Sequence, residues 1–143
     1  MAAATASRRG VLLANTPAGH PVLCDIDGAT KYLGFTLGSV NASGQAIAYA
    51  DGSQNQFVGL FKAEDDSSSE TAGDRKVELW QGVVVKLIVS DTIGQDDVGK
   101  EVYAEDNQTV SLTQAGTESK IGYIVEVTGA NEAFVFIYHG NNA

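Results

Sequence analysis

Short apolar runs that recur along the chain are the feature that most limits its possible folds. Runs such as Tyr32–Leu37, Phe57–Phe61 and Val83–Val89 are rich in β-branched and aromatic residues, and glycine, aspartate, asparagine and serine lie between them. These runs are too short for helices, and no amphipathic helical pattern occurs. Strands that recur about every 8–12 residues, with turns between them, predict an all-β fold, a small barrel or sandwich.

The N-terminal segment has a different character. An arginine pair, a short apolar patch and both prolines of the chain precede Cys24, and proline removes a backbone donor and opposes regular structure. Such segments are often ordered only by a partner. We therefore expect an extended N-terminal arm at residues 1–24 and a β-rich domain at 25–143, with a barrel core at about 77–140. Within this domain, the acidic stretch Ala63–Asp74 predicts an exposed loop.

Charge and hydrophobicity exclude two classes of partner. The formal net charge is −9, from 9 basic and 18 acidic side chains, and such a surface is poorly suited to releasing counterions from DNA or RNA. No apolar run approaches the roughly 18 residues of a membrane span. We therefore expect neither a nucleic acid nor a membrane as a partner. The single cysteine, Cys24, excludes an intrachain disulfide, and the fold must be held by packing.

The stretch Gly94–Glu101, GQDDVGKE, matches the P-loop pattern G-x-x-x-x-G-K-[ST] except at its last position. A working P-loop opens a helix and ends in a hydroxyl that binds magnesium. Here a glutamate replaces that hydroxyl, only three residues precede the next turn, and the two aspartates within the stretch would repel a triphosphate. We therefore predict a β-turn in which Gly94 and Gly99 supply unusual backbone angles.

Other candidate chemical sites are weaker still. Asp25–Gly28 begins like a calcium loop, but Lys31 falls among the positions that should be ligands. His20 and His139 lack a second histidine or a cysteine at the spacing of metal ligands. A dyad of His20 and Cys24 would need an electropositive niche to activate the thiol, and the neighbourhood is acidic. We assign no catalytic residue, no metal and no cofactor, and we expect that the protein is not an enzyme.

The aromatic residues near the C-terminus allow two interpretations. Phe134, Phe136 and Tyr138 alternate along an expected strand, and alternate residues share one face of a strand. This row fits a buried core, which we favour. The alternative is a subunit interface formed by the row and Trp80, because aromatic side chains are enriched at interfaces.

An ordered series of turn and strand patterns runs along the chain. In chain order, the patterns are Gln45–Gly52, Phe57–Phe61, Gly82–Val85, Asp97–Tyr103, Glu105–Val110 and Lys120–Val125, followed by a terminal strand of alternating apolar residues. From Val77 to Gly140 this series resembles the head decoration, or capsid cement, proteins of tailed phages. The two upstream runs fit an extension found in some family members, and the resemblance covers about two thirds of the chain.

The resemblance implies a structural protein with no catalytic activity. Members of this family would bind the outer surface of an icosahedral capsid as homotrimers and bridge neighbouring major capsid protein subunits. Such bridges would stabilise the shell against the pressure of packaged DNA. The implied location is the outer surface of the virion, with the host cytoplasm before assembly.

An extended arm suits this role, because an arm can add a strand to an exposed sheet edge of a capsid subunit. We expect apolar side chains of the arm to act as anchors and its two arginines to meet acidic groups of the capsid. A tail with no binding role is the alternative. The expected capsid-binding residues are Arg8, Arg9, Val11, Leu12, Leu13, Val22 and Leu23.

A second class of function is a carbohydrate-binding or adhesive β-module displayed on the same particle. Exposed aromatic side chains can stack on sugar rings, and Trp80 and Tyr32 are the candidates.

Overall fold

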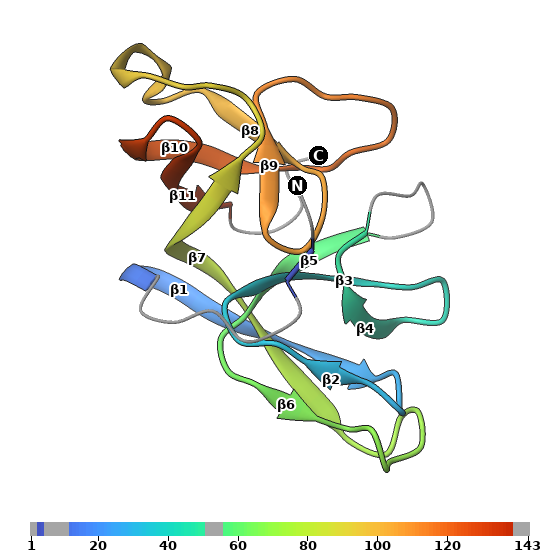
Figure 1. Ribbon diagram of the computed structural model, residues 1–143. Helices are drawn as coiled ribbons and strands as arrows, with labels where there is room; N and C mark the ends of the chain where they lie inside the picture. The colour runs from blue at the N-terminus through green and yellow to red at the C-terminus, as the bar shows by residue number, and fades with distance from the viewer. Residues whose placement is uncertain (1–2, 5–11, 51–55, 139–143) are drawn as a thin grey trace.

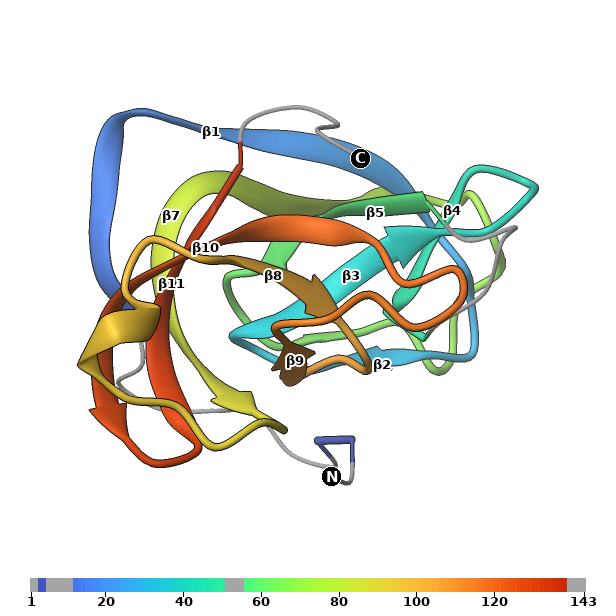
Figure 2. The same cartoon turned by 90° about the horizontal axis from the view of Figure 1, so that it is seen from above.

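The computed structural model describes residues 3–4, 12–50 and 56–138, with the backbone alone for residues 12–20 (Figures 1 and 2). These residues form eleven strands and one single-turn 3₁₀ helix, η1, and they contain no α-helix. The predicted all-β class is therefore confirmed. The elements are β1 Leu12–Ile26, β2 Lys31–Tyr32, β3 Thr36–Val40, β4 Gln45–Ala48, β5 Gln56–Phe61, β6 Asp65–Asp66, β7 Lys76–Val89, η1 Gln95–Asp97, β8 Glu101–Ala104, β9 Thr109–Ser111, β10 Lys120–Gly129 and β11 Glu132–Ile137.

Nine of the strands form one mixed sheet, in the order β1-β4-β3-β5-β7-β11-β10-β8-β9. Two additional pairings, β1–β7 and β7–β9, fold this sheet back onto β7. The result is two partly closed rings that share β7, and neither is a regular barrel. The first ring contains β1, β4, β3, β5 and the start of β7, and the second contains the end of β7 with β11, β10, β8 and β9. They lie in the lower and upper halves of Figure 1.

Strand β7 serves both rings because it changes partners along its length. Leu79 and Trp80 pair with β5, whereas residues 84–88 pair with β11. Gly82 lies between these two segments with a φ of 69°, a left-handed value that glycine adopts without steric cost. Opposite this point, the register of β1 against β7 shifts between Asn15 and His20. A bulge of this kind increases local bend and twist, which lets one strand turn from one ring into the next.

Two apolar clusters fill the interior. The smaller one lies in the first ring and includes Ile26, Phe61 and Leu79, each no more than 1% exposed. Gly38 is required here, because a Cβ at that position would lie 2.5 Å from both Leu79 Cδ2 and Phe61 Cε2. The larger cluster contains the end of β7, and Val83, Val85, Leu87 and Val89 are all fully buried in it. Burial of one such side chain contributes about 1.5–3 kcal/mol.

The acidic stretch 63–74 is not simply an exposed loop, so that prediction is wrong in part. Asp65 and Asp66 form β6, which pairs with β2 at the base of the molecule. Ser67 is fully buried, and both its backbone N–H and its hydroxyl donate to the carbonyl of Thr30, each at 2.8 Å. These backbone and hydroxyl contacts hold the start of the stretch against the first ring.

Candidate binding surfaces

Strands β1 and β7 bring together Leu23 and Trp80, which the sequence assigned to two different candidate sites. Pro21 is opposite Trp80, and Leu23 is opposite Glu78. Cross-strand partners share a face of the sheet, as do residues two positions apart, so all four side chains lie on the outer face of the first ring. Leu23 is 60% exposed and Trp80 is partly exposed. We call these four residues and Lys62 the docking patch.

The indole of Trp80 is held in a fixed position within the docking patch. Its Nε1 donates to Oε2 of Glu78 at 3.1 Å, and the ammonium of Lys62 lies 4.4 Å from the ring centroid. The pairing of β5 with β7 stops at Phe61 and Leu79. Beyond this point the two chain segments line a cavity of about 390 Å³, formed by Lys62, Ala63, Glu64, Asp65, Val77 and Glu78.

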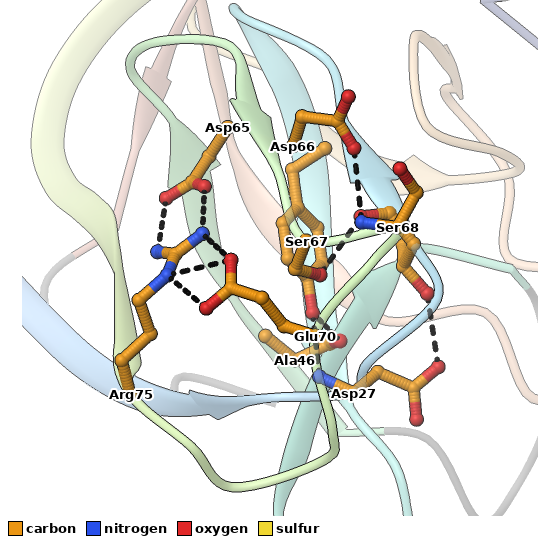
Figure 3. Close-up of polar contacts among 10 residues, drawn as sticks. Asp27, Ala46, Asp65, Asp66, Ser67, Ser68, Glu70 and Arg75 are labelled. Carbon is orange, nitrogen blue, oxygen red and sulfur yellow. Dashed lines mark hydrogen bonds and ion pairs between the residues drawn. The ribbon is translucent and has the colours of Figure 1, made fainter.

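A network of ion pairs holds the segment that forms one wall of this cavity (Figure 3). The guanidinium of Arg75 donates to both carboxylate oxygens of Asp65, and its Nε lies 2.9 Å from Oε2 of Glu70. These hydrogen bonds to two carboxylates raise the pKa of Arg75. A bidentate geometry fixes orientation as well as distance. Arg75 therefore links β6 to the start of β7 and sets the position of this wall.

Tyr32, a candidate for sugar stacking, is 2% exposed. Its hydroxyl donates to the carbonyl of Ala46 at 2.7 Å and accepts from the backbone N–H of Asp27 at 2.8 Å. Its ring stacks on Phe61 with centroids 4.8 Å apart, and burial raises the pKa of the phenol. The expectation that Tyr32 is exposed is therefore wrong, because the hydroxyl finds partners inside the first ring.

The structure places the remaining arm residues as follows. Val22 is partly buried and packs against the core of the first ring, on the opposite face from Leu23. Leu12 and Leu13 lie in the described backbone of β1, and Leu12 is opposite Val85. From Leu12 onwards the expected arm is extended, and it is paired with β7 of its own chain. Arg8, Arg9 and Val11 lie outside the described residues, as does His139.

The stretch that resembles a P-loop forms a turn, as predicted. After η1 the chain enters β8 at Glu101, so no helix follows the motif. Asp97 closes the turn by accepting from the backbone N–H of Gly94 at 2.9 Å and from Nζ of Lys100 at 2.8 Å. These two contacts lower the pKa of Asp97. Gly99 has the predicted positive φ, 91°, but Gly94 is extended with a φ of −141° and needs no glycine.

The aromatic row of β11 is not core, so the favoured interpretation of these residues is wrong. Ala133, Val135 and Ile137 are fully buried, whereas the alternate residues Phe134, Phe136 and Tyr138 are only partly buried and lie on the outer face of the second ring. Tyr123 of β10 is opposite Phe136, with ring centroids 5.4 Å apart, and it is 6.0 Å from the ring of Tyr138. We call Tyr123, Val125, Phe134, Phe136 and Tyr138 the aromatic face. Trp80 belongs to the first ring and lies outside this face.

Tyr138 is oriented by its neighbours at the edge of the aromatic face. Its hydroxyl donates to Oε2 of Glu101 at 2.7 Å, and the ammonium of Lys120 lies 3.4 Å from the same oxygen. Burial, followed by the hydrogen bond to the carboxylate, raises the pKa of Tyr138 to about 12. The phenol therefore stays neutral at physiological pH, and its one strong donor is already satisfied.

Among the residues that the structure describes, no group of three or more histidine, cysteine or acidic side chains could hold a metal ion. Cys24 is buried, which raises the pKa of its thiol. In the same part of the chain, no helix is long and apolar enough to cross a bilayer.

Comparison with known proteins gives no assignment. No family model, no curated protein sequence and no solved structure matches this chain.

Proposed function

We propose that this protein binds the outer surface of an icosahedral phage capsid and stabilises the shell by bridging major capsid protein subunits. The proposal takes its partner, the virion surface location and the homotrimeric state from the resemblance to head decoration proteins. The role requires no bond to be made or broken. It requires a surface that can dock and a body stiff enough to transmit load.

The observation that carries the proposal is the position of Leu23 in the docking patch. Among the side chains that the structure describes, it is the most exposed large apolar residue, at 60%. It lies on the outer face of β1, beside a tryptophan that is held by Lys62 and Glu78. Binding hot spots combine an aromatic anchor with apolar neighbours inside a polar rim. The docking patch has this composition.

The outer edge of β1 offers a second means of attachment. Its inner edge pairs with β7, and on the other edge β4 pairs only with Asp25 and Ile26. Among the described residues, the outer edge of β1 before Asp25 therefore faces no strand. Backbone donors and acceptors on an open edge can pair with a strand of a partner. The expected strand addition would then use β1 as it stands, without release from β7.

Weak individual contacts are sufficient for such a protein. Once one docking patch of an oligomer is bound, the next binds at a high effective concentration, and avidity can exceed the single affinity by about 10²–10⁴. Contacts of this kind across the junctions between capsid subunits would oppose the separation that internal DNA pressure favours.

Binding to phage heads that lack this protein tests the proposal. We expect Leu23→Asp to weaken binding about tenfold or more, because it places a charge in the contact. Val98→Asp is the matched control, since Val98 is 45% exposed, lies after η1 in the second ring and undergoes the same change of charge. Removal of residues 1–11 tests Arg8 and Arg9 separately, because β1 begins at Leu12. Equal binding by Leu23→Asp and Val98→Asp, with both variants folded, would remove the docking patch from the proposal.

The alternative sugar-binding function now depends on Trp80 alone, because Tyr32 is buried. Lys62 covers the indole and Glu78 binds its N–H. These contacts leave less of the ring available for stacking, so we favour the docking role.

A further inference from the structure

We infer that the aromatic face is covered by a second copy of this chain. The inference deepens the proposed function, because it identifies the surface through which the oligomer would form. It concerns a different surface from the docking patch, on the other ring (Figure 1). Self-association can therefore be measured on the purified protein without any capsid.

The aromatic face is apolar and already ordered. Tyr123 and Val125 are 36% and 37% exposed, two of the four large apolar side chains that are exposed in the described residues. The rings of Tyr123, Phe136 and Tyr138 contact one another with centroids 5.4–6.5 Å apart. Aromatic side chains of this kind contribute a large contact area, and little rotamer entropy is lost when they are buried further.

The topology restricts how a partner can cover this face. β11 lies between β7 and β10, and β10 lies between β11 and β8. β11 is paired on both edges from Glu132 to Phe136, and β10 is paired on both edges at Gly122 and Tyr123, so no open edge lies beneath the Tyr123–Phe136 contact. A partner must pack face to face with the outer side chains, as in sheet-on-sheet packing. A second aromatic or apolar face suits this geometry better than an extended peptide does.

Charge opposes a second copy of this chain less at this face than the net charge of the whole chain would suggest. The chain as a whole carries −9, so two copies repel each other over most of their surfaces. The strands β8, β10 and β11 and the second half of β7 carry only two lysines and three glutamates, which sum to −1. These residues are Lys86, Glu101, Lys120, Glu126 and Glu132.

Ion pairs further reduce the field at the aromatic face. Lys120 lies 3.4 Å from Glu101, and Lys86 lies 3.7 Å from Glu132. Lys86 also lies 5.4 Å from the ring centroid of Phe134. Because Glu101 accepts the hydroxyl of Tyr138, this phenol donor would remain satisfied when the face is buried. These ion pairs and the low net charge of the surrounding strands reduce the repulsion that a like molecule meets at this face.

The test is the mass of the full-length protein in solution, measured by sedimentation equilibrium over a range of concentrations. We expect an oligomer for the unaltered chain and a dissociation constant at least about tenfold higher for Tyr123→Lys. The lysine lowers the net negative charge, so weaker general repulsion cannot explain dissociation. Val98→Lys is the matched control, because it makes a similar change of charge at an exposed position outside the aromatic face.

Three outcomes would overturn the inference. The first is an unaltered chain that remains monomeric at about 1 mM, where even a weak contact of about −4 kcal/mol would be half formed. The second is an unchanged dissociation constant for Tyr123→Lys with native far-ultraviolet circular dichroism. The third is equal weakening of self-association by Val98→Lys, which would make the effect one of general charge.

If Tyr123→Lys fails to fold, Val125→Lys tests the same face at a second exposed position. Equal capsid binding by Leu23→Asp and Val98→Asp would count against the docking patch alone and would leave this inference unaffected.

Discussion

Substitution of Gly122 by alanine tests the packing of the second ring most directly. Gly122 lies in β10 and is opposite Ile137 of β11 and Val102 of β8. A Cβ at this position would lie 1.8 Å from the carbonyl oxygen of Phe136 and 2.8 Å from its carbonyl carbon. Both atoms belong to the backbone, so no side chain can rotate away to relieve the clash. The two strands must separate locally.

The expected loss of stability follows from two costs. Overpacking that forces a backbone shift costs about 1–3 kcal/mol, and each ladder hydrogen bond that is weakened adds about 1 kcal/mol. Alanine reduces the entropy of the unfolded chain and offsets about 0.4–1 kcal/mol of this. We therefore expect a net loss of about 2–3 kcal/mol. For 143 residues, an unfolding entropy of about 2.1 cal/mol/K per residue converts this to a fall in Tm of about 7–10 °C.

Gly129→Ala in the same strand is the control. The nearest atom to its added Cβ is Cβ of Glu132 at 3.8 Å, an ordinary van der Waals distance. We expect this variant to melt within about 2 °C of the unaltered protein, or slightly above it. Thermal unfolding followed by circular dichroism compares the two. Equal melting temperatures for Gly122→Ala and Gly129→Ala would refute the close approach of β10 and β11 at this position.

Two further predictions concern the polar groups. Arg75→Lys removes the guanidinium that binds Asp65 and Glu70, and a single ammonium cannot reproduce these contacts. We therefore expect faster amide hydrogen exchange at residues 63–75. Unchanged exchange there would contradict the role given to Arg75. At high pH, the folded pKa of Tyr138 is raised to about 12 from an ordinary value of 10.0. The stability that this group contributes is complete below pH 10 and is lost as pH rises through 12. Tyr138→Phe removes the ionisable group and should flatten the decline in denaturant midpoint over this range, whereas an unaltered slope would assign the decline to other groups.

The local pattern of the sequence was sufficient to predict strands and turns, because both depend on residues that are close in the chain. The β-branched run at 83–89 and the glycine turn at 99 are of this kind. The closure of the sheet into two rings could not be predicted from local pattern. It depends on β7 pairing with four other strands, including a parallel pairing of Ile88 and Val89 with β9. Pairings between distant segments leave no local signature in one sequence.

The aromatic row of β11 shows why alternation alone did not identify the core. Both faces of this strand are apolar, so a period of two residues has two valid assignments. The larger side chains were expected inside, but Ala133, Val135 and Ile137 occupy the interior. The interior of a small ring has room for small and branched side chains, and the larger aromatic rings are placed on its outer face. Side-chain size therefore decided which face of β11 points inward, and it placed the larger aromatic residues outside.

The position of the candidate surfaces could likewise not be derived from spacing. Leu23 and Trp80 are far apart in the sequence, and they become neighbours only through the register of β1 against β7. Leu23 and Val22 were both expected to be anchors, yet adjacent residues on a strand point to opposite faces. Val22 packs into the first ring, and Leu23 remains exposed. Because of this register, Val22 has a structural role and Leu23 is available to a partner.

Strand β7 connects the two proposed surfaces mechanically. Trp80 lies on it within the docking patch, and Lys86, whose ammonium lies 5.4 Å from the ring centroid of Phe134 in the aromatic face, lies six residues further along. This strand pairs with β1, β5, β9 and β11, so force applied at either surface is shared among several hydrogen-bonded ladders. A protein that holds capsid subunits together must resist extension between its partner and its neighbours. A continuous strand shared by both rings meets that requirement better than two domains joined by a flexible linker would, because a linker lengthens under load.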